Sequence, residues 1–488
     1  MPELLENFLN HLNNEIDSLY SCALVSRHLC KISIPILWQD PFSFDQNPLF
    51  ISQYFSSLDE NEKLGLKEYG INIEFPNTLF NYARFLKFLD LNSFEQEVEN
   101  WINLQLVTYN TNSVTFVFNL LFKLLAESGA TLHELGLHYS NYEINPEIFY
   151  LLEQNEQFFS RLQGLSFGPM PTYISTYITL LKILAKNATN ISSLKIEEIY
   201  YNNEAQLRHA IITFIKSQEQ LKQFGLFSEE AKIMEAHGII SALKSQKLSL
   251  QEVTLESCNF DEEFETLIDC ENLEILRIRY CNYVKILAAN LNTLEIIGCS
   301  IDTSNMVQIL QKSGSLLQRL KFESTDNEVW KELSILETLK SFCPNITHLE
   351  LRRVELSTHL LELIGNLQNL QFLTLLHVNN IPEEDPEIRV MHFAKILPST
   401  LQYLDIRYSC LYTYIETFLN NCYAPLKNLL IHRIDTEKKA KALINFCIRK
   451  RTLNYVGVEP KFSPDGNIEK EVEEYVTFVN HECIRVDC

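Results

Sequence analysis

A six-residue phrase recurs thirteen times between Leu132 and Val458. It consists of an apolar residue, two variable residues, a second apolar residue, one variable residue and a third apolar residue. Most copies start 23 to 31 residues after the previous one, with one shorter step of 18 residues. A unit of this length cannot bury its own apolar face, so neighbouring copies must stack. The chain is therefore predicted to be largely a solenoid that presents a long surface.

The period of the phrase is close to that of leucine-rich repeats. Apolar helical segments and polar turns separate the copies, which predicts an α/β leucine-rich-repeat solenoid with a curved parallel sheet inside and helices outside. The copies are Leu132-Leu135-Leu137, Leu162-Leu165-Phe167, Ile191-Leu194-Ile196, Leu221-Phe224-Leu226, Leu250-Val253-Leu255, Leu273-Leu276-Ile278, Leu291-Leu294-Ile296, Leu317-Leu320-Phe322, Ile346-Leu349-Leu351, Leu370-Leu373-Leu375, Leu401-Leu404-Ile406, Leu426-Leu429-Ile431 and Leu453-Val456-Val458, with Leu86-Leu89-Leu91 as an earlier one.

Three cysteines support this repeat register. Cys258, Cys281 and Cys299 each stand three residues after the last apolar position of a phrase. Leucine-rich repeats usually carry Asn or Cys at this position, stacked as a ladder inside the turn. A metal site would need chelating spacing and His or Cys partners, and no such spacing is evident. We interpret the three cysteines as structural and expect no metal or cofactor.

The phrase divides the chain into three predicted parts. Residues 1–45 lack it and have apolar residues at helical spacing, which predicts a small helical domain. Residues 46–80 are expected to form a helical linker, with one helix over 49–66, and residues 81–488 the solenoid. A C-terminal capping helix is expected to shield the last repeat. Its apolar face would be formed by Ile468, Val472, Tyr475, Val476 and Val479.

Charge and composition limit the kinds of partner and the cellular compartment that we expect for this chain. The net charge of −22 argues against a nucleic-acid-binding body, because phosphate contacts need clustered Lys and Arg. The apolar stretch from Val114 to Ala126 is too short to span a membrane, so we expect a buried helix there. Twelve cysteines without a CxxC pair or a basic signal-like start indicate reduced thiols. A cytoplasmic or nuclear location is expected, with no membrane contact.

Catalytic motifs are absent from the sequence. It contains no phosphate-binding loop, no GxGxxG, no HExxH and no GxSxG. His133, His138 and His348 fall within or just after phrases and are interpreted as solvated surface residues. The chain is therefore not expected to be an enzyme.

The position between the last two apolar residues of each phrase is predicted to point to the concave face of the sheet. In the central repeats this position alternates in charge through Arg277, Glu295, Lys321 and Glu350. Parallel strands lie about 4.8 Å apart, so these side chains should be neighbours. Two interpretations are open: a self-neutralising ladder, which we favour, or a dedicated binding motif.

The two flanks of this predicted face differ in size and polarity. Toward the N-terminus the inward residues are small: Gly136, Gly164, Ser166, Gly168 and Gly225. Toward the C-terminus they are bulky or apolar: Phe372, Leu376, Tyr403, Leu430 and Tyr455. Exposed aromatic residues are common anchors at interfaces. We predict that a protein client binds through these five C-terminal residues.

The N-terminal helical domain carries a motif. Pro2-Glu3-Leu4-Leu5 is followed by Leu12 and then by the run Asp17 to Arg27, DSLYSCALVSR, and by His28 to Trp38, HLCKISIPILW. This pattern resembles an F-box, and the whole chain resembles the fungal F-box and leucine-rich-repeat proteins. The resemblance implies a three-helix domain that binds a Skp-family adaptor and, through it, a cullin. The adaptor contacts implied are Pro2, Leu4, Leu5, Ile16, Leu19, Leu24 and Val25.

The resemblance implies a substrate-recognition subunit of an SCF-type ubiquitin ligase, in which the solenoid binds an unknown client. An alternative is a non-catalytic leucine-rich-repeat scaffold with a degenerate F-box and no ubiquitin role. In that case the leucines of the helical domain would merely dock it on the first repeat. Some apolar side chains of so small a domain must remain exposed or bind a partner.

Overall fold

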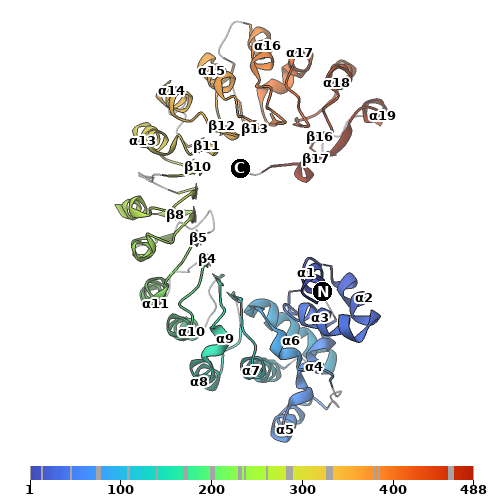
Figure 1. Cartoon of the computed structure of the whole chain (residues 1–488), viewed down its shortest axis with the longest axis vertical. Coiled ribbons are helices and arrows are strands. Elements are labelled where there is room, and N and C mark those ends of the chain that lie inside the picture. Colours follow the sequence, from blue (N-terminus) through green and yellow to red (C-terminus); the bar gives the residue numbers. More distant parts are fainter. Residues whose placement is uncertain are drawn as a thin grey trace. The chain divides into compact units, whose positions relative to one another are not determined.

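The computed structural model divides into two compact units, Met1–Ser228 and Glu229–Cys488, called unit 1 and unit 2 below. In each unit the helices of the repeats lie on one side of the strands (Figure 1). We call the opposite side of the strands the inner face. The structure describes residues 2–12, 15–43, 47–72, 78–106, 110–138, 141–168, 174–197, 204–228, 234–235, 238–259, 262–281, 290–325, 333–378, 380–381, 385–459 and 466–486.

Unit 1 begins with a three-helix domain, called the head below: α1 (Pro2–Asn10), α2 (Ile16–Val25) and α3 (Arg27–Leu37). Ser26 separates the last two helices because its backbone is extended (φ −158°, ψ 158°) and its hydroxyl accepts a hydrogen bond from the Leu29 amide at 3.2 Å. Leu9, Leu19 and Ile36 form a small core of the head.

The segment after the head is more broken than predicted. In place of one helix over 49–66, it contains η1 (Pro48–Phe50), α4 (Ile51–Tyr54), η2 (Phe55–Ser57), α5 (Glu60–Glu68) and η3 (Tyr82–Phe85). Asp59 starts α5 with a reciprocal capping box to Glu62, which interrupts the longer helix. The Trp38 ring packs against Tyr54 and Tyr82 at centroid distances of 5.2 and 4.1 Å. Aromatic packing therefore joins the end of α3 to this segment.

The repeats of unit 1 pair in parallel in chain order from β1 to β5, with the middle apolar residues of successive phrases in register (Leu89, Leu135, Leu165, Leu194 and Phe224). The helix α7 contains the predicted buried stretch Val114 to Ala126. The elements are β1 (Phe88–Asp90), α6 (Leu91–Gln105), α7 (Thr111–Glu127), β2 (Glu134–Leu137), α8 (Pro146–Gln154), α9 (Glu156–Phe159), β3 (Gly164–Phe167), α10 (Ile174–Asn187), β4 (Ser193–Glu197), α11 (Glu204–Ser217) and β5 (Gln223–Phe227).

Unit 2 continues the pattern, with parallel pairing in the order β7-β9-β10-β11-β12-β13-β14-β15-β16-β17 and a small β6–β8 pair. Its elements are β6 (Met234–Glu235), α12 (Ile239–Ala242), η5 (Leu243–Gln246), β7 (Glu252–Glu256), β8 (Cys258–Asn259), η6 (Glu262–Asp269), β9 (Ile275–Arg279), β10 (Thr293–Cys299), α13 (Thr303–Ser313), β11 (Arg319–Ser324), α14 (Leu333–Phe342), β12 (His348–Arg352), α15 (Thr358–Asn366), β13 (Phe372–Leu376), α16 (Pro386–Ile396), β14 (Tyr403–Asp405), η7 (Cys410–Tyr414), α17 (Ile415–Asn421), β15 (Asn428–Leu430), α18 (Glu437–Lys450), β16 (Tyr455–Val458), α19 (Gly466–Glu473), β17 (Thr477–Asn480) and η9 (His481–Cys483).

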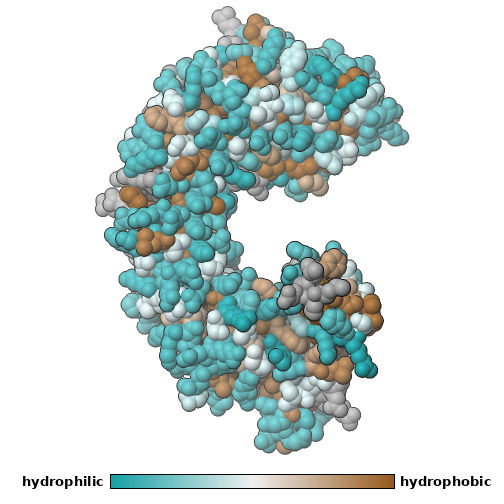
Figure 2. Space-filling model, viewed as in Figure 1, coloured by the Kyte–Doolittle hydropathy of each residue, from teal (hydrophilic) through white to brown (hydrophobic). Residues whose placement is uncertain are grey.

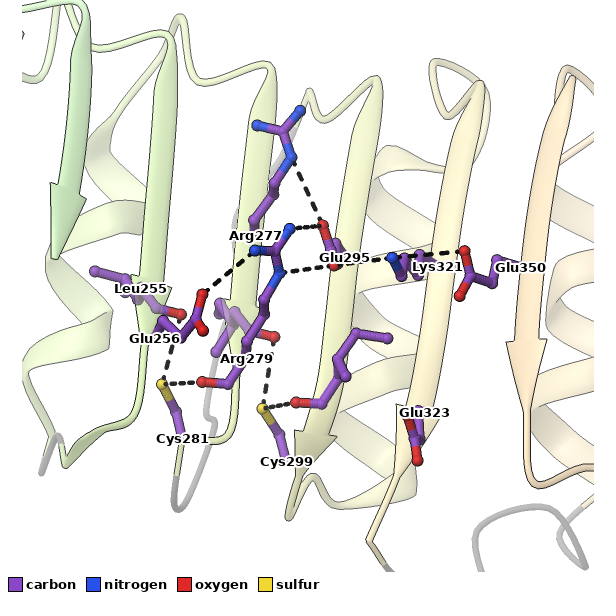
Figure 3. A network of polar contacts seen from close by, with 12 residues as sticks. Leu255, Glu256, Arg277, Arg279, Cys281, Glu295, Cys299, Lys321, Glu323 and Glu350 are labelled. Carbon is purple, nitrogen blue, oxygen red and sulfur yellow. Dashed lines mark hydrogen bonds and ion pairs between the residues drawn. The ribbon is translucent and has the colours of Figure 1, made fainter. Parts of the chain in front are cut away.

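The expected cysteine ladder is confirmed. Cys258, Cys281 and Cys299 are buried and not disulfide-bonded. The Cys281 thiol donates to the carbonyl of Leu255 in the preceding repeat at 3.7 Å, and Cys299 donates to the carbonyl of Ile278 at 3.6 Å (Figure 3). Thiols thus satisfy backbone acceptors at the turn, which is a structural role.

A left-handed residue precedes each rung of this ladder. Ser257, Tyr280 and Gly298 have φ values of 53°, 54° and 62°, and Arg353, His377 and Tyr408 repeat this geometry two residues after the last apolar position of later phrases. This turn aims the next side chain into the core while the preceding strand stays extended. Together with the buried phrases, these features establish the predicted α/β leucine-rich-repeat solenoid.

The predicted capping helix is only partly correct. The helix α19 ends at Glu473, and Thr477–Asn480 instead forms β17, which pairs with β16. Val476 and Val479 therefore do not continue the helix. Pairing with the edge of β16 outweighs the helical spacing of these side chains, because an edge strand without a partner leaves its backbone N–H and C=O groups unpaired. The last repeat is thus closed by a strand as well as a helix.

Candidate functional site

The charged side chains at the inward positions of unit 2 form one connected network. Strand register places Arg277, Glu295, Lys321 and Glu350 side by side on β9 to β12, which confirms the expected alternation. The Lys321 ammonium lies 3.5 Å from both the Glu295 and the Glu350 carboxylates (Figure 3). The self-neutralising interpretation therefore fits the geometry.

Glu295 is the centre of this network. Its carboxylate accepts two hydrogen bonds from Arg279, at 2.8 Å from Nε and 3.0 Å from Nη2, and is 3.7 Å from Arg277 Nε. The residue is only 1% exposed. Burial raises the pKa of Glu295, but Arg279, Lys321 and Arg277 together hold it below its usual value. Glu295 is therefore a buried anion shared by three cations.

Further pairs extend the network along the strands. Arg277 pairs with Glu252, Arg279 with Glu256, and Arg352 with Glu350 and Glu323. The cavity over these strands has a volume of about 560 Å³. Six basic residues line it (Arg277, Arg279, Arg319, Lys321, Arg352 and Arg485), against two acidic ones (Glu256 and Glu295). We call this cavity the basic basin.

The predicted client-binding residues do not form an exposed surface. Tyr403 is 1% exposed, Leu430 0% and Leu376 8%, so the expectation that these three side chains are free on the inner face is wrong. Phe372 is half-buried, and only Tyr455 is clearly exposed, at 42%.

Residues 481–486, called the tail segment below, cover part of this region. The Val486 amide donates to the Tyr403 hydroxyl at 3.4 Å. A Cβ built on Gly457 would lie 3.1 Å from His481 Cα and 3.2 Å from Ile484 Cδ1. The strand pattern could not reveal this cover, because the segment follows the last phrase and carries no repeat signal.

His348 is also placed differently from the prediction. It is 9% exposed, and its ring stacks on Phe372 with centroids 4.1 Å apart and planes 9° apart. Burial and the charge of Arg319 lower the pKa of His348 to about 4. It is thus a neutral, packed side chain and not a solvated one.

The small residues on the inner face of unit 1 do not all leave the backbone accessible as expected, because the His138 side chain lies against Gly136 and Gly168 and the Phe227 ring lies against Gly225. A cavity of about 730 Å³ is lined by residues that include Gly136, Gly164 and Ser166. At one side the His138 ring pairs with the Asp90 carboxylate, which raises the pKa of the imidazole. The sequence patterns did not predict this pair. Asp90 lies within the earliest phrase, and His138 directly follows the next phrase, so aligning the two phrases would have placed them near each other.

The head exposes part of the predicted adaptor surface. Leu24 and Val25 are 72% and 73% exposed, and Phe8 and Tyr20, which were not predicted, are 61% and 59% exposed. Hydrophobic residues are visible on the surface over α2 (Figure 2). Several exposed large apolar side chains on so small a domain are typical of an interaction site.

The other predicted adaptor contacts are less accessible. Leu5 and Ile16 are half-buried, and Leu19, at 1% exposed, belongs to the core of the head and is not a surface contact. Its place on the inside of α2 follows from its contact with Leu9 and Ile36. The side chains of Pro2 and Leu4 lie outside the described residues.

No group of His, Cys, Asp and Glu that could hold a metal ion exists among the described residues. Within the same residues, no helix is long and apolar enough to cross a membrane.

No family model matches the chain, and no curated protein matches it. Among solved structures it is similar to the complex of Rad7 and Elc1 in yeast, with 13% identity, a TM-score of 0.36 and coverage of 81% of this chain and 94% of that chain. It is also similar to the leucine-rich-repeat-containing protein LegL7 from Legionella pneumophila (11% identity, TM-score 0.34, 69% of this chain and 98% of that chain). A third is a protein from Bacteroides fragilis (15% identity, TM-score 0.29, 58% and 72%). At these identities and TM-scores the similarities carry no argument about partners, and the leucine-rich-repeat architecture rests on the repeats of this chain.

Proposed function

We propose that this chain is the substrate-recognition subunit of an SCF-type ubiquitin ligase. The head binds a Skp-family adaptor, and the leucine-rich-repeat solenoid binds the client protein. The observation that carries the proposal is the head itself: three short helices with their own core that leave Phe8, Tyr20, Leu24 and Val25 in solvent.

The exposure of Leu24 and Val25 argues against a purely structural role for these side chains. If Leu24 and Val25 docked the head on the first repeat, they would be buried, but more than 70% of each is exposed. The head is instead attached through Trp38 at the end of α3. Burying a Leu or Val side chain in a partner contributes about 1.5–3 kcal/mol, so these side chains can anchor an adaptor.

Adaptor co-purification tests the head. We expect Leu24→Asp/Val25→Asp to reduce recovery of a Skp-family adaptor at least about tenfold, because two buried charges oppose association. Leu64→Asp/Leu104→Asp is a matched control, since both leucines are similarly exposed (55% and 57%) on α5 and α6. Unchanged recovery with the head variant would overturn the adaptor role and favour the scaffold alternative.

Client turnover then separates a ligase subunit from a scaffold that merely binds an adaptor. Proteins captured by the solenoid should accumulate under proteasome inhibition, and the same proteins should accumulate when Leu24→Asp/Val25→Asp replaces the wild type. Captured proteins whose half-lives are the same with both forms would contradict a degradation role.

A further inference from the structure

The end of α18 differs in charge pairing from its beginning. In the first turns, Lys441 pairs with Glu437 at 3.6 Å. At the other end, among the described residues, the side chains of Lys450 and Arg451 form no ion pair and no hydrogen bond, and neither does that of Lys427, directly before β15. In a chain with a net charge of −22, these side chains are a local excess of positive charge.

An exposed tyrosine lies among these cations. The Tyr423 ring is 58% exposed, with Lys450 Nζ 5.2 Å and Arg449 Cζ 5.6 Å from its centroid. Ile448, in the last turn of α18, is 50% exposed. The attraction between a cation and an aromatic ring orders such side chains before a partner binds, which lowers the entropy lost on binding.

Lys427 belongs to the same surface. Its backbone carbonyl accepts a hydrogen bond from the Asn454 amide at 2.8 Å, which places Lys427 beside the chain that follows Arg451. We call this surface the Tyr423 patch; it consists of Tyr423, Lys427, Ile448, Lys450 and Arg451.

Helix capping accounts for a neighbour of the patch but not for the patch itself. The Arg449 guanidinium donates to three backbone carbonyls at and just after the end of α17, at 2.7–3.0 Å, and so closes that helix. A cation at the end of α18 also interacts favourably with the helix dipole. Neither effect involves Lys427, which lies outside the helices, or explains why Tyr423 and Ile448 are exposed beside the cations.

We propose that the Tyr423 patch is a docking surface for a short acidic segment of a partner protein. Carboxylates of the segment pair with Lys427, Lys450 and Arg451, and one apolar side chain of the segment packs on Tyr423 and Ile448. The helix α18 lies on the helix side of the strands of unit 2, so this surface is separate from the inner face (Figure 1). The inference goes beyond the proposed function, because it adds a second protein contact and does not depend on adaptor binding.

The charge of the whole chain decides which kind of polyanion fits. Charges more than about 8 Å apart are largely screened at physiological salt, so the cations of the patch dominate the binding of a short segment. A nucleic acid or an anionic membrane covers a wider area and would meet the acidic remainder of a chain with net charge −22. A short acidic segment is therefore the occupant that the patch favours.

Fluorescence anisotropy with three labelled nine-residue peptides tests this chemistry on the full chain. The first peptide has a central leucine with four aspartate or glutamate residues on each side. The second has serine in place of the leucine. The third keeps the leucine but has asparagine and glutamine in place of all acidic residues.

Lys450→Glu/Arg451→Asn should weaken binding of the acidic leucine peptide at least about tenfold, because two ion pairs are lost and a like charge is added. Asparagine is chosen at position 451 because the backbone there is left-handed, with φ at 54°. Lys438→Glu/Lys441→Asn is the matched control. It makes the same change in charge on α18, about 13 Å or more from Lys450 along the helix, and should change the affinity less than about twofold.

The peptides separate the two parts of the proposed contact. The acidic leucine peptide should bind the wild type at least about fivefold more tightly than the serine peptide, and Ile448→Ser should remove this difference. Equal binding of these two peptides by the wild type would overturn the apolar contact. A neutral peptide that binds as tightly as the acidic leucine peptide would overturn the acidic chemistry. An equal loss of affinity in the control variant would show that the acidic segment binds elsewhere.

Two further measurements complete the test. Lys427→Glu leaves α18 unchanged and should weaken binding of the acidic leucine peptide at least about threefold, so an unchanged affinity refutes the patch even if Lys450→Glu/Arg451→Asn fails to fold. Sedimentation with phosphatidylcholine vesicles that contain phosphatidylserine tests a membrane as the occupant. Binding to these vesicles that Lys450→Glu/Arg451→Asn abolishes, together with no binding of the acidic leucine peptide, would overturn the assignment to a partner protein.

Discussion

Glu295 is predicted to be the most stabilising member of the charge network in unit 2. Its carboxylate contacts Arg279 at 2.8 and 3.0 Å, Lys321 at 3.5 Å and Arg277 at 3.7 Å while only 1% of the residue is exposed. Glu295→Gln keeps the shape and one acceptor but removes the charge.

The magnitude follows from these contacts. Hydrogen bonds to charged groups contribute about 1.5–3 kcal/mol, and breaking a buried pair costs about 3–5 kcal/mol. Since the three cations keep partners in Glu252, Glu256 and Glu350, the lower part of this range applies. We expect Glu295→Gln to lower the free energy of unfolding by about 2–3 kcal/mol.

Urea unfolding monitored by circular dichroism measures this loss, with Glu252→Gln as the control. The Glu252 side chain is 25% exposed and pairs with Arg277, and because solvent screens a partly exposed pair, its loss should cost about 1 kcal/mol. The reasoning would be refuted if Glu295→Gln cost no more than Glu252→Gln.

The dependence on pH provides a second check on Glu295. Its pKa is lower in the folded state than in the unfolded state, so its stabilisation is present above the unfolded value and is lost as pH falls through the folded value. The difference between wild type and Glu295→Gln should therefore be constant near neutral pH and shrink in the acid range below the usual glutamate pKa.

Three further predictions concern other sites. Asp90→Asn should lower the pKa of His138, because the Asp90 carboxylate raises that pKa, and histidine NMR titration measures the change. The stabilisation by this pair is complete below the usual histidine pKa and is lost as pH rises through the raised value, so the variant should be destabilised at pH 6 and not at pH 9. A difference in the free energy of unfolding that does not depend on pH would contradict this reasoning. Gly298→Ala should lower the free energy of unfolding by about 1–2 kcal/mol, because φ is 62° at this position. Gly365→Ala, inside α15, is the control and should not destabilise the protein. Equal shifts in the thermal unfolding temperature of the two variants would count against the left-handed turn. Alkylation of the native protein should modify the exposed Cys483 quickly and spare Cys299, because burial raises the pKa of the Cys299 thiol to about 12; similar rates by mass spectrometry would rule this out.

The repeat phrase was sufficient to predict most of the fold. Each phrase fixes which residues face the helices, because a strand alternates its side chains and the helices cover only one face. The register that pairs Arg277, Glu295, Lys321 and Glu350 followed directly from aligning the phrases. The cysteine ladder followed in the same way. The spacing of residues within each phrase is therefore enough to predict the strand register and the cysteine ladder.

The capping region shows where local spacing fails. Val472 and Val476 have helical spacing, yet the chain leaves the helix after Glu473 and pairs as β17. The competing interaction is backbone pairing with β16, a partner formed by another repeat. A helical pattern cannot report that an unpaired strand edge lies nearby.

The sequence by itself determined the solenoid, its register, the helical head and the charge order along the inner face. Only the tertiary structure decided which of the predicted contact residues a partner can reach: Tyr403 and Leu430 on the inner face are buried, and Leu24 and Val25 on the head are exposed. The physical reason is that packing between repeats is periodic and local, whereas the tail segment reaches Tyr403 through a hydrogen bond from Val486, 83 positions away in the chain. No periodic pattern encodes such a contact, so the accessible part of the candidate site depends on the folded chain.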